Sequence, residues 1–331
     1  MHLEHLNLLV CPKCHGTLTC ARDDATTDSG PILEGRLACA ACGLEYPIIA
    51  GVPRFVPLEN YASGFGLEWT KHARTQYDSH SGIPASEQRF FSQTQWPRDM
   101  HGELILEVGS GSGRFTEQAA RTGATVVSFD YSYAVDANYA SNGAYKNVLI
   151  VQADVFAMPF RPYSFDRLFC FGMLQHTPSP SRAFAALPTV VKPGGSICAD
   201  IYRISILRTV LMPKYWVRPL TRHMNPDRLY ARVQRWVDFM WPLSNLIRKL
   251  PKGHGINWRL LVADYSPLGL KGQILKEWAY LDTFDMLAPR YDRPATKKAF
   301  HRWGERAHLI DIDAQFSPHG IVMRARAPLQ S

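Results

Sequence analysis

The chain has 331 residues, of which 46% are hydrophobic and 20% are charged. This composition is that of a globular protein and excludes a disordered chain, and the length is sufficient for more than one domain. No apolar run approaches the roughly 20 residues of a membrane-spanning helix, and the start of the chain lacks the pattern of a signal peptide. The net charge of +8 is compatible with RNA, an anionic lipid surface or a phosphorylated substrate, and does not choose among them.

The seven cysteines are not spaced as a disulfide framework, which predicts a reducing, cytoplasmic setting. Four of them form two C-x-x-C pairs, Cys11 with Cys14 and Cys39 with Cys42. Each pair can place two thiolates on one tetrahedral ion, and four thiolates favour zinc. A site with four cysteine ligands has no open position, so the sequence predicts a structural rather than a catalytic metal.

The residues that follow the second pair, 44–54, read LEYPIIAGVPR. Together with the cysteine pairs, this tail resembles the small zinc-binding protein that activates several RNA and protein methyltransferases. The resemblance covers about residues 6–57 and implies a zinc ribbon, which we assign to residues 1–57. It implies a stabilising or substrate-presenting role for the ribbon.

A glycine-rich turn follows an apolar run at residues 104–113, LILEVGSGSG, and a helix is predicted over 114–122. Gly109, Gly111 and Gly113 allow a sharp turn and let a ligand approach the main chain. The start of the helix would present free N–H groups to an anionic group. A turn of this kind also occurs in other doubly wound proteins that bind nucleotides.

With Glu107 two residues before the first glycine, the pattern E-x-G-x-G-x-G resembles the first motif of class I S-adenosylmethionine (SAM)-dependent methyltransferases. The following elements have the order of that family: strands over 124–129, 147–153, 164–171 and 196–201, a KPGG turn at 192–195, and a hairpin of 308–316 with 320–327. The resemblance implies an α/β fold with a doubly wound, seven-stranded, Rossmann-like sheet that ends in an antiparallel hairpin. It assigns this core to residues 101–202 and 296–331.

The resemblance also implies that SAM is the cofactor and which residues contact it. Besides the motif residues Glu107, Gly109, Gly111 and Gly113, it points to the ends of three strands. Asp130 ends the second strand, where an acidic residue can accept both ribose hydroxyls, and Tyr131 adjoins it. Asp154 and Val155 match the family's adenine-binding position, and Phe171 lies where the chain passes the reactive methyl group.

The segment 58–100 contains FGLEW at 65–69 and RTQYD at 74–78. These sequences are similar to the lead-in of bacterial SAM methyltransferases from sugar and surface-polysaccharide pathways. In such enzymes the region closes over the cofactor, which implies that three side chains cover the methionine end: Trp69, Arg74 and Gln76. The alternative is a linker that packs on the core.

The segment 203–295 is longer than a crossover needs, and we expect a mostly helical insert on the substrate side. Its first part is basic, with only Asp227 and Asp238 opposing Arg203, Arg208, Lys214, Arg218, Arg222, Arg228, Arg232, Arg235, Arg248, Lys249, Lys252 and Arg259. Aromatic residues are interleaved, and 229–240 reads as an amphipathic helix. The insert could hold a substrate phosphate, lie peripherally on an anionic membrane, bind RNA, form a homodimer face, or be a lid with a solvated basic side.

Three residues are candidates for the chemistry. The segment 278–294 also resembles the sugar-pathway methyltransferases, and the resemblance implies that Asp285 and Tyr291 contact the acceptor. His176 follows the fourth strand and has a pKa suited to taking a proton near neutral pH; the alternative is that it only packs the loop.

These features together predict a cytoplasmic SAM-dependent methyltransferase with a fused zinc ribbon. The expected acceptor is a small molecule or a sugar-containing intermediate, methylated on oxygen by in-line transfer. The alternatives are an RNA methyltransferase, and a non-catalytic protein that keeps the fold as a scaffold.

Overall fold

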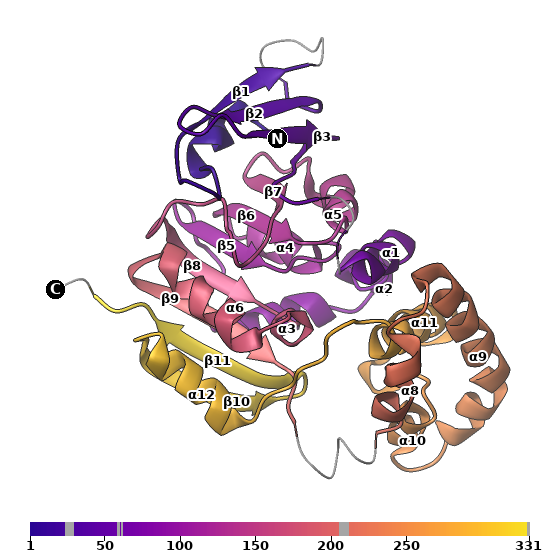
Figure 1. Ribbon diagram of the computed structural model, residues 1–331. Helices are drawn as coiled ribbons and strands as arrows, with labels where there is room; N and C mark the ends of the chain where they lie inside the picture. Colours follow the sequence, from indigo (N-terminus) through magenta and orange to yellow (C-terminus); the bar gives the residue numbers. More distant parts are fainter. Residues whose placement is uncertain (24–29, 58–59, 61, 205–211, 330–331) are drawn as a thin grey trace.

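The computed structural model describes residues 1–23, 30–57, 60, 62–204 and 212–329, so Arg208 of the basic insert lies outside the described residues. Strands form two sheets, one of four strands at the N-terminal end and one of seven strands in the centre of the molecule (Figure 1). A group of helices lies to one side of the central sheet (Figure 1).

The N-terminal sheet is antiparallel, with the order β1 (Leu18–Arg22), β2 (Gly35–Cys39), β3 (Glu45–Ile49) and β4 (Val52–Pro53), after a 3₁₀ helix η1 (Leu3–Leu8). The sheet does not stand alone. Leu37 and Ile48 belong to the same buried cluster as Leu106 of the central sheet. Two backbone bonds fasten the small sheet to the larger one, from Val10 to the Pro159 carbonyl at 2.9 Å and from the amide of residue 55 to the carbonyl of residue 152 at 2.8 Å.

The central sheet has the order β10-β11-β9-β8-β5-β6-β7. Five parallel strands form its body: β5 (Leu104–Val108), β6 (Thr125–Asp130), β7 (Val148–Gln152), β8 (Phe165–Cys170) and β9 (Val191–Ile201). The hairpin of β10 (Ile310–Ser317) and β11 (Gly320–Arg326) completes it, with β11 antiparallel to β9. The predicted sheet and its terminal hairpin are confirmed. One detail differs, because the KPGG residues lie inside β9, where the pairing with β8 shifts register, and do not form a separate turn.

Short helices join the parallel strands: α4 (Arg114–Ala120), α5 (Val135–Asn142), α6 (Pro180–Ala186), and the 3₁₀ turns η2 (Leu174–His176) and η3 (Leu187–Val190). Helix α12 (Lys297–Arg306) precedes the hairpin, and Phe300 packs against Phe184 of α6. Continuous apolar strands such as β7, VLIVQ, are buried over their whole length, as expected for a parallel sheet covered on both faces.

The segment before the central sheet folds into α1 (Ser63–Lys71), α2 (Asp78–Ser81) and α3 (Ala85–Thr94). It packs on the glycine-rich turn, because the buried Tyr77 hydroxyl donates to the Ser112 carbonyl at 2.7 Å and the Trp69 ring lies against Gly111. The segment is therefore part of the wall of the core rather than a free linker.

The insert is helical where it is described, with α8 (Lys214–Thr221), α9 (Pro226–Ile247), α10 (Gly253–Arg259), the 3₁₀ turn η4 (Ser266–Leu268) and α11 (Gly272–Leu287). Its own buried cluster includes Val233 and Val237 of α9 and Phe284 of α11. Among the helices that the structure describes, none is long and apolar enough to span a bilayer.

Candidate functional site

A cavity of about 1390 Å³ lies at the carboxyl ends of the parallel strands. Its floor comes from the loops after β5, β6, β7 and β8, and its walls from α1, α3, α11 and the turn of the β10–β11 hairpin. Ligands of open α/β sheets bind at this edge, where the loops leave the strands.

The glycine-rich turn lines the cavity, and a side chain at any of its three glycines would clash with a neighbour. Gly109 has φ +81°, and a Cβ there would lie 2.5 Å from the Cβ of Met173. Gly111 has φ +53°, and a Cβ would lie 2.9 Å from Trp69 Nε1. Both glycines line the cavity, whereas Gly113 packs against Asn138 of α5 and is not among the lining residues.

Glu107 lies beneath this turn and is 2% exposed. Its carboxylate accepts hydrogen bonds from the hydroxyls of Thr116 on α4 and Ser128 on β6, the second at 2.8 Å. Burial raises its pKa to about 7 against the effect of these two hydrogen bonds. The structure thus does not bring Glu107 into the cavity; its carboxylate joins β5, β6 and α4 under the glycine turn.

Two acidic residues at the ends of β6 and β7, Asp130 and Asp154, do line the cavity. Tyr131 and Val155, which follow them in the sequence, line it as well. Asp130 accepts the Gly111 amide at 2.9 Å with one oxygen and the Ser132 amide and hydroxyl with the other. Burial raises its pKa. Asp154 accepts the amide of residue 156 at 2.9 Å. The two carboxylates stand at the carboxyl ends of the adjacent strands β6 and β7.

Two of the three residues predicted for the methionine end lie at the cavity. Trp69 and Gln76 line it, as does Phe171, whose ring packs on Phe115 at 5.4 Å. Arg74 does not belong to the lining residues; it is exposed and donates to Ser79 Oγ at 3.1 Å. Helix α1 ends before Arg74, and the structure places this side chain at the surface.

His176 lies in η2 and lines the cavity. Its Nδ1 lies 3.0 Å from the backbone carbonyl of Tyr291. A carbonyl oxygen only accepts, so Nδ1 carries the proton and the neutral ring keeps its lone pair on Nε2. The ring is held between Phe65 and Tyr202, at centroid distances of 4.9 and 5.5 Å.

The two residues of the insert that were expected to contact the acceptor, Asp285 and Tyr291, differ in their position relative to the cavity. Asp285 of α11 lines the cavity and accepts the Tyr202 hydroxyl at 3.4 Å. Tyr291 is absent from the described lining, and its contribution is the carbonyl that orients His176.

Sequence reasoning missed several titratable residues of the cavity, namely Arg89, Arg114, Asp282 and His319. Burial, and then the nearby Asp285, raise the pKa of Asp282 to about 7. Arg114 directly follows the glycine motif, which was a signal within the sequence. The others come from α3, α11 and the terminal hairpin, and only the fold brings them together.

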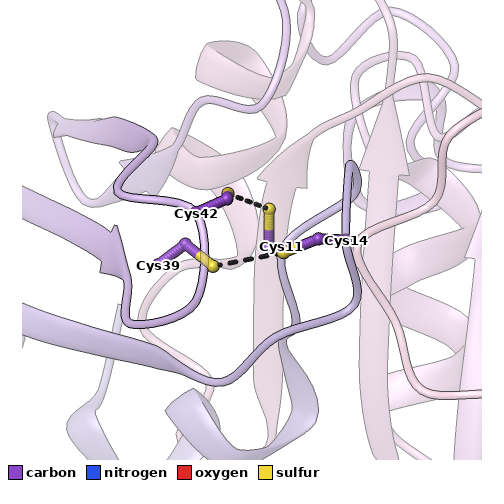
Figure 2. Close-up of side chains that lie close together, drawn as sticks. All are labelled: Cys11, Cys14, Cys39 and Cys42. Atoms are coloured by element: carbon purple, nitrogen blue, oxygen red, sulfur yellow. Dashed lines mark hydrogen bonds between the residues drawn. The ribbon is translucent and has the colours of Figure 1, made fainter.

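The four cysteines of the N-terminal sheet converge as predicted (Figure 2), with all Sγ atoms within 4.8 Å of one another. Cys11 and Cys42 are 3.7 Å apart at sulfur, and Cys14 and Cys39 are 3.4 Å apart. Zinc–sulfur bonds of about 2.3 Å in a tetrahedron require sulfurs about 3.8 Å apart. The cluster therefore fits one structural zinc ion.

Comparison with known proteins agrees with both parts of this description. Residues 106–199 match the family model "Methyltransferase domain", and residues 2–51 match "Trm112p-like protein". The chain is 36% identical over 172 residues to the ubiquinone biosynthesis O-methyltransferase of Paraburkholderia phymatum, covering 50% of this chain and 72% of that one. The chain belongs to the SAM-dependent methyltransferases.

Other relatives match a smaller part. The demethylmenaquinone methyltransferase of Thermobifida fusca is 32% identical over 99 residues, which are 29% of this chain and 42% of that protein. Among solved structures, a complex of the Haloferax volcanii Trm112 methyltransferase activator with a methyltransferase aligns with a TM-score of 0.45 and 11% identity, covering 80% of this chain and 97% of that one.

SAM is the cofactor of this family, and the residues present fit it. The glycines at 109 and 111 leave open the space that a Cβ would occupy, and the carboxylates of Asp130 and Asp154 follow adjacent strands along the same wall. These are the features that a nucleoside with an attached amino acid requires from a sheet of this topology.

Proposed function

We propose that the chain transfers the methyl group of SAM to a hydroxyl group of a small aromatic acceptor bound in the same cavity. The observation that carries the proposal is the size and continuity of this cavity. Sites for one small ligand are typically about 300–1,000 Å³, and this cavity of about 1390 Å³ runs from the glycine turn to His176. It has room for a cofactor and an acceptor together.

The aromatic character of the acceptor is supported by the walls beyond the glycine turn, which include Phe91, Phe115, Tyr265 and Trp278. Aromatic rings pack well on such surfaces. The names of the two relatives above place them in ubiquinone and menaquinone chemistry, and one is an O-methyltransferase. They give less support to a sugar-containing acceptor and do not favour the RNA alternative.

In this proposal each end of the cavity has a separate task. Asp130 with Tyr131 holds the ribose, Asp154 with Val155 the adenine, and Trp69, Gln76 and Phe171 the methionine portion. When bound, SAM supplies an electrophilic methyl group. His176 Nε2 accepts the proton of the acceptor hydroxyl, and the carbonyl of Tyr291 fixes the ring in the tautomer that can do so. Asp285 is placed to contact the acceptor.

The proposal also divides the chain by task. Residues 101–202 with 296–331 carry the cofactor, 58–100 cover it, and 203–295 complete the acceptor side. Residues 1–57 hold the zinc ion and support the edge of the core next to β7 through the backbone bonds described above.

The test is to incubate the purified protein with methyl-labelled SAM and, in parallel, with catechol and with total cellular RNA. We expect label in a methyl ether of catechol, identified by mass spectrometry, and none in RNA. Asp130→Ala, which removes the ribose carboxylate, is the negative control. Label in nuclease-sensitive material alone would overturn the small-acceptor proposal. Binding of SAM without transfer to either acceptor would favour the scaffold alternative.

A further inference from the structure

Two guanidinium groups lie over one aromatic ring in the cavity. Arg89 of α3 is 5.3 Å from the ring centre of Phe115, and Arg114 of α4 is 4.5 Å from the same centre. Like charges repel, and the repulsion is stronger where water is partly excluded. Such a pair is stable only if negative charge lies close to both groups.

Only one of the two cations is neutralised. Arg89 forms an ion pair with the buried Asp200 at 2.8 Å, and Asp200 in turn accepts the Gly172 amide at 2.6 Å. Within the described part of the chain, the Arg114 guanidinium has no ion pair and no hydrogen bond. Burial, and then the charge of Arg89, lower the pKa of Arg114 to about 10, so it is still a cation at neutral pH.

Asp282 also lines the cavity but does not act as this partner. Among the described residues, no ion pair or hydrogen bond joins its carboxylate to Arg114, and its Oδ2 accepts from Gln76 Nε2 at 3.4 Å. Two further polar groups that line this part of the cavity also lack partners among the described residues, the buried Nε2 of Gln93 and the hydroxyl of Ser317. An unpaired cation and two unsatisfied polar groups in one place mark a site whose ligand supplies acceptor atoms.

We propose that Arg114 binds a carboxylate carried by the acceptor, so that the substrates are aromatic hydroxy acids. This inference rests on the proposed function. The guanidinium presents a planar pair of N–H donors that matches a carboxylate, and the aromatic side chains of Tyr265 and Trp278 line the same cavity. The carboxylate completes the charge balance that Asp200 provides for Arg89 alone.

The test measures binding rather than turnover, so it does not depend on methyl transfer. The protein is loaded with S-adenosylhomocysteine and titrated with 4-hydroxybenzoate or with its neutral analogue 4-hydroxybenzamide. We expect the carboxylate to bind more tightly, and Arg114→Gln to abolish the difference by weakening the carboxylate roughly 10- to 150-fold, the range of a hydrogen bond to a charged group. Arg98→Gln is the matched control, because Arg98 also lines the cavity but pairs with Glu87 at the surface.

Two results would overturn this inference. One is equal or undetectable binding of both probes to the unaltered protein. The other is a loss of SAM affinity in Arg114→Gln while the preference for the carboxylate persists, which would assign the cation to the cofactor's own carboxylate. Failure of methyl transfer with a carboxylate preference intact would count against the proposed function and not against the site.

A second feature, on the outer side of the helical insert, is independent of the cavity. Helix α9 buries Leu229, Val233, Val237 and Met240 against its neighbours. An adjacent, exposed face carries a second apolar stripe at helical spacing that continues beyond the helix end, with exposed fractions of 41% at Trp236, 76% at Phe239, 46% at Leu243, 62% at Leu246 and 54% at Leu250. Figure 1 shows α9 at the outer edge of the helical insert, on the right of the view.

Exposed basic residues border this stripe at both ends: Arg228, Arg232 and Arg235 before it, and Lys249 and Lys252 after it. None of them forms an ion pair among the described residues. Of the two acids on α9, Asp238 is neutralised by Lys276 at 2.6 Å, and Asp227 lies in the first turn. An apolar stripe with a basic border is the pattern of a helix that lies in the interface of an anionic bilayer.

The geometry points to an anionic phospholipid surface as the partner of this face. The test is sedimentation of the protein with vesicles of phosphatidylcholine, with and without phosphatidylglycerol. We expect the protein to bind only the anionic vesicles, and added salt to weaken this binding. In the double variant Arg232→Gln with Arg235→Gln, the affinity for anionic vesicles should fall by about fivefold for each arginine removed. Phe239→Asp with Leu246→Asp should weaken it by roughly tenfold or more for each residue.

Leu3→Asp with Leu329→Asp, two exposed apolar residues elsewhere on the chain, should leave vesicle binding unchanged. Absence of binding to anionic vesicles would overturn the inference. So would a dimer in sedimentation velocity that the α9 variants dissociate, because the stripe would then be an interface between two copies of the chain.

Discussion

His176 and Tyr291 are joined across 115 residues of sequence by one hydrogen bond, from the imidazole Nδ1 to the backbone carbonyl at 3.0 Å. The bond connects the loop after β8 to the end of the insert. It also fixes which nitrogen is free to act toward the cavity. The arrangement ties the proposed base to the part of the chain that completes the acceptor side.

Replacement of His176 by alanine should therefore lower kcat for hydroxyl methylation by roughly 10²- to 10⁴-fold, the range of general-base catalysis. SAM affinity should be largely unchanged, because the imidazole shares no hydrogen bond with Asp130 or Asp154 and contacts Phe65, Tyr202 and the Tyr291 carbonyl instead. Steady-state kinetics and equilibrium binding of SAM check the two statements. Phe65→Leu, which removes a packing neighbour but no proton acceptor, is the control. Turnover of His176→Ala close to that of the control would remove histidine from the chemistry.

Substitution of Gly109 tests whether the glycine-rich turn binds SAM. Gly109→Ala should abolish SAM binding, because the new methyl group would lie 2.5 Å from Met173 Cβ at a backbone φ of +81°. The positive φ alone costs about 1 kcal/mol. Gly102→Ala isolates that cost, since Gly102 has φ +80° and no atom within 4 Å of the added Cβ. Calorimetric titration with SAM, alongside chemical denaturation, should show both variants modestly destabilised and only Gly109→Ala deficient in binding.

Features that depend on a few neighbouring residues could be predicted from the sequence, and features that depend on the packing of distant segments could not. The four cysteines and the glycine turn are recognised from a few adjacent residues, and the structure brings the cysteines together as expected. Arg74 was placed by resemblance alone, and the end of α1 turns it to solvent. Arg89 and Asp282 carry no local signal, because their positions in the cavity depend on how α3 and α11 pack on the sheet.

Glu107 shows a further difference between pattern and structure. The resemblance of the motif implied that Glu107 contacts the cofactor. In the structure its carboxylate accepts hydrogen bonds from the hydroxyls of Thr116 and Ser128 beneath the turn. Sequence spacing gives the position of a residue along a strand. It does not reveal that two hydroxyls from other elements lie within reach of the carboxylate, because that depends on the pairing of β5 with β6.

The pH dependence of stability should report on Glu107. Its pKa is about 7 in the folded chain and 4.5 in its ordinary state, so the folded state binds a proton that the unfolded state releases between these values. The resulting stabilisation is present below about pH 4.5 and is lost as the pH rises through 7. The loss is on the order of 2–3 kcal/mol.

Glu107→Gln cannot ionise and should lack this part of the pH dependence. Urea denaturation at pH 5 and pH 8, without SAM, measures the difference in the free energy of unfolding for both proteins. Other buried acids also contribute to the pH dependence, some with a raised pKa, such as Asp130, and some with a lowered one, such as Asp264, so the comparison of the two proteins isolates Glu107. An identical change with pH in the wild-type protein and in Glu107→Gln would show that the carboxyl titrates normally in the folded state.

Removal of the metal tests the role of the N-terminal sheet. The sheet shares a buried cluster with the core through Leu9, Leu37 and Ile48, so its unfolding should expose part of the core beside β7. Cys14→Ser removes one thiolate ligand and should release zinc, lower the melting temperature and increase proteolysis within residues 1–57. Cys20→Ser, outside the cluster, is the matched control. Metal content by mass spectrometry and thermal unfolding measure the effect, and a Cys14→Ser protein that kept its zinc and its melting temperature would refute the structural role of the four-cysteine site.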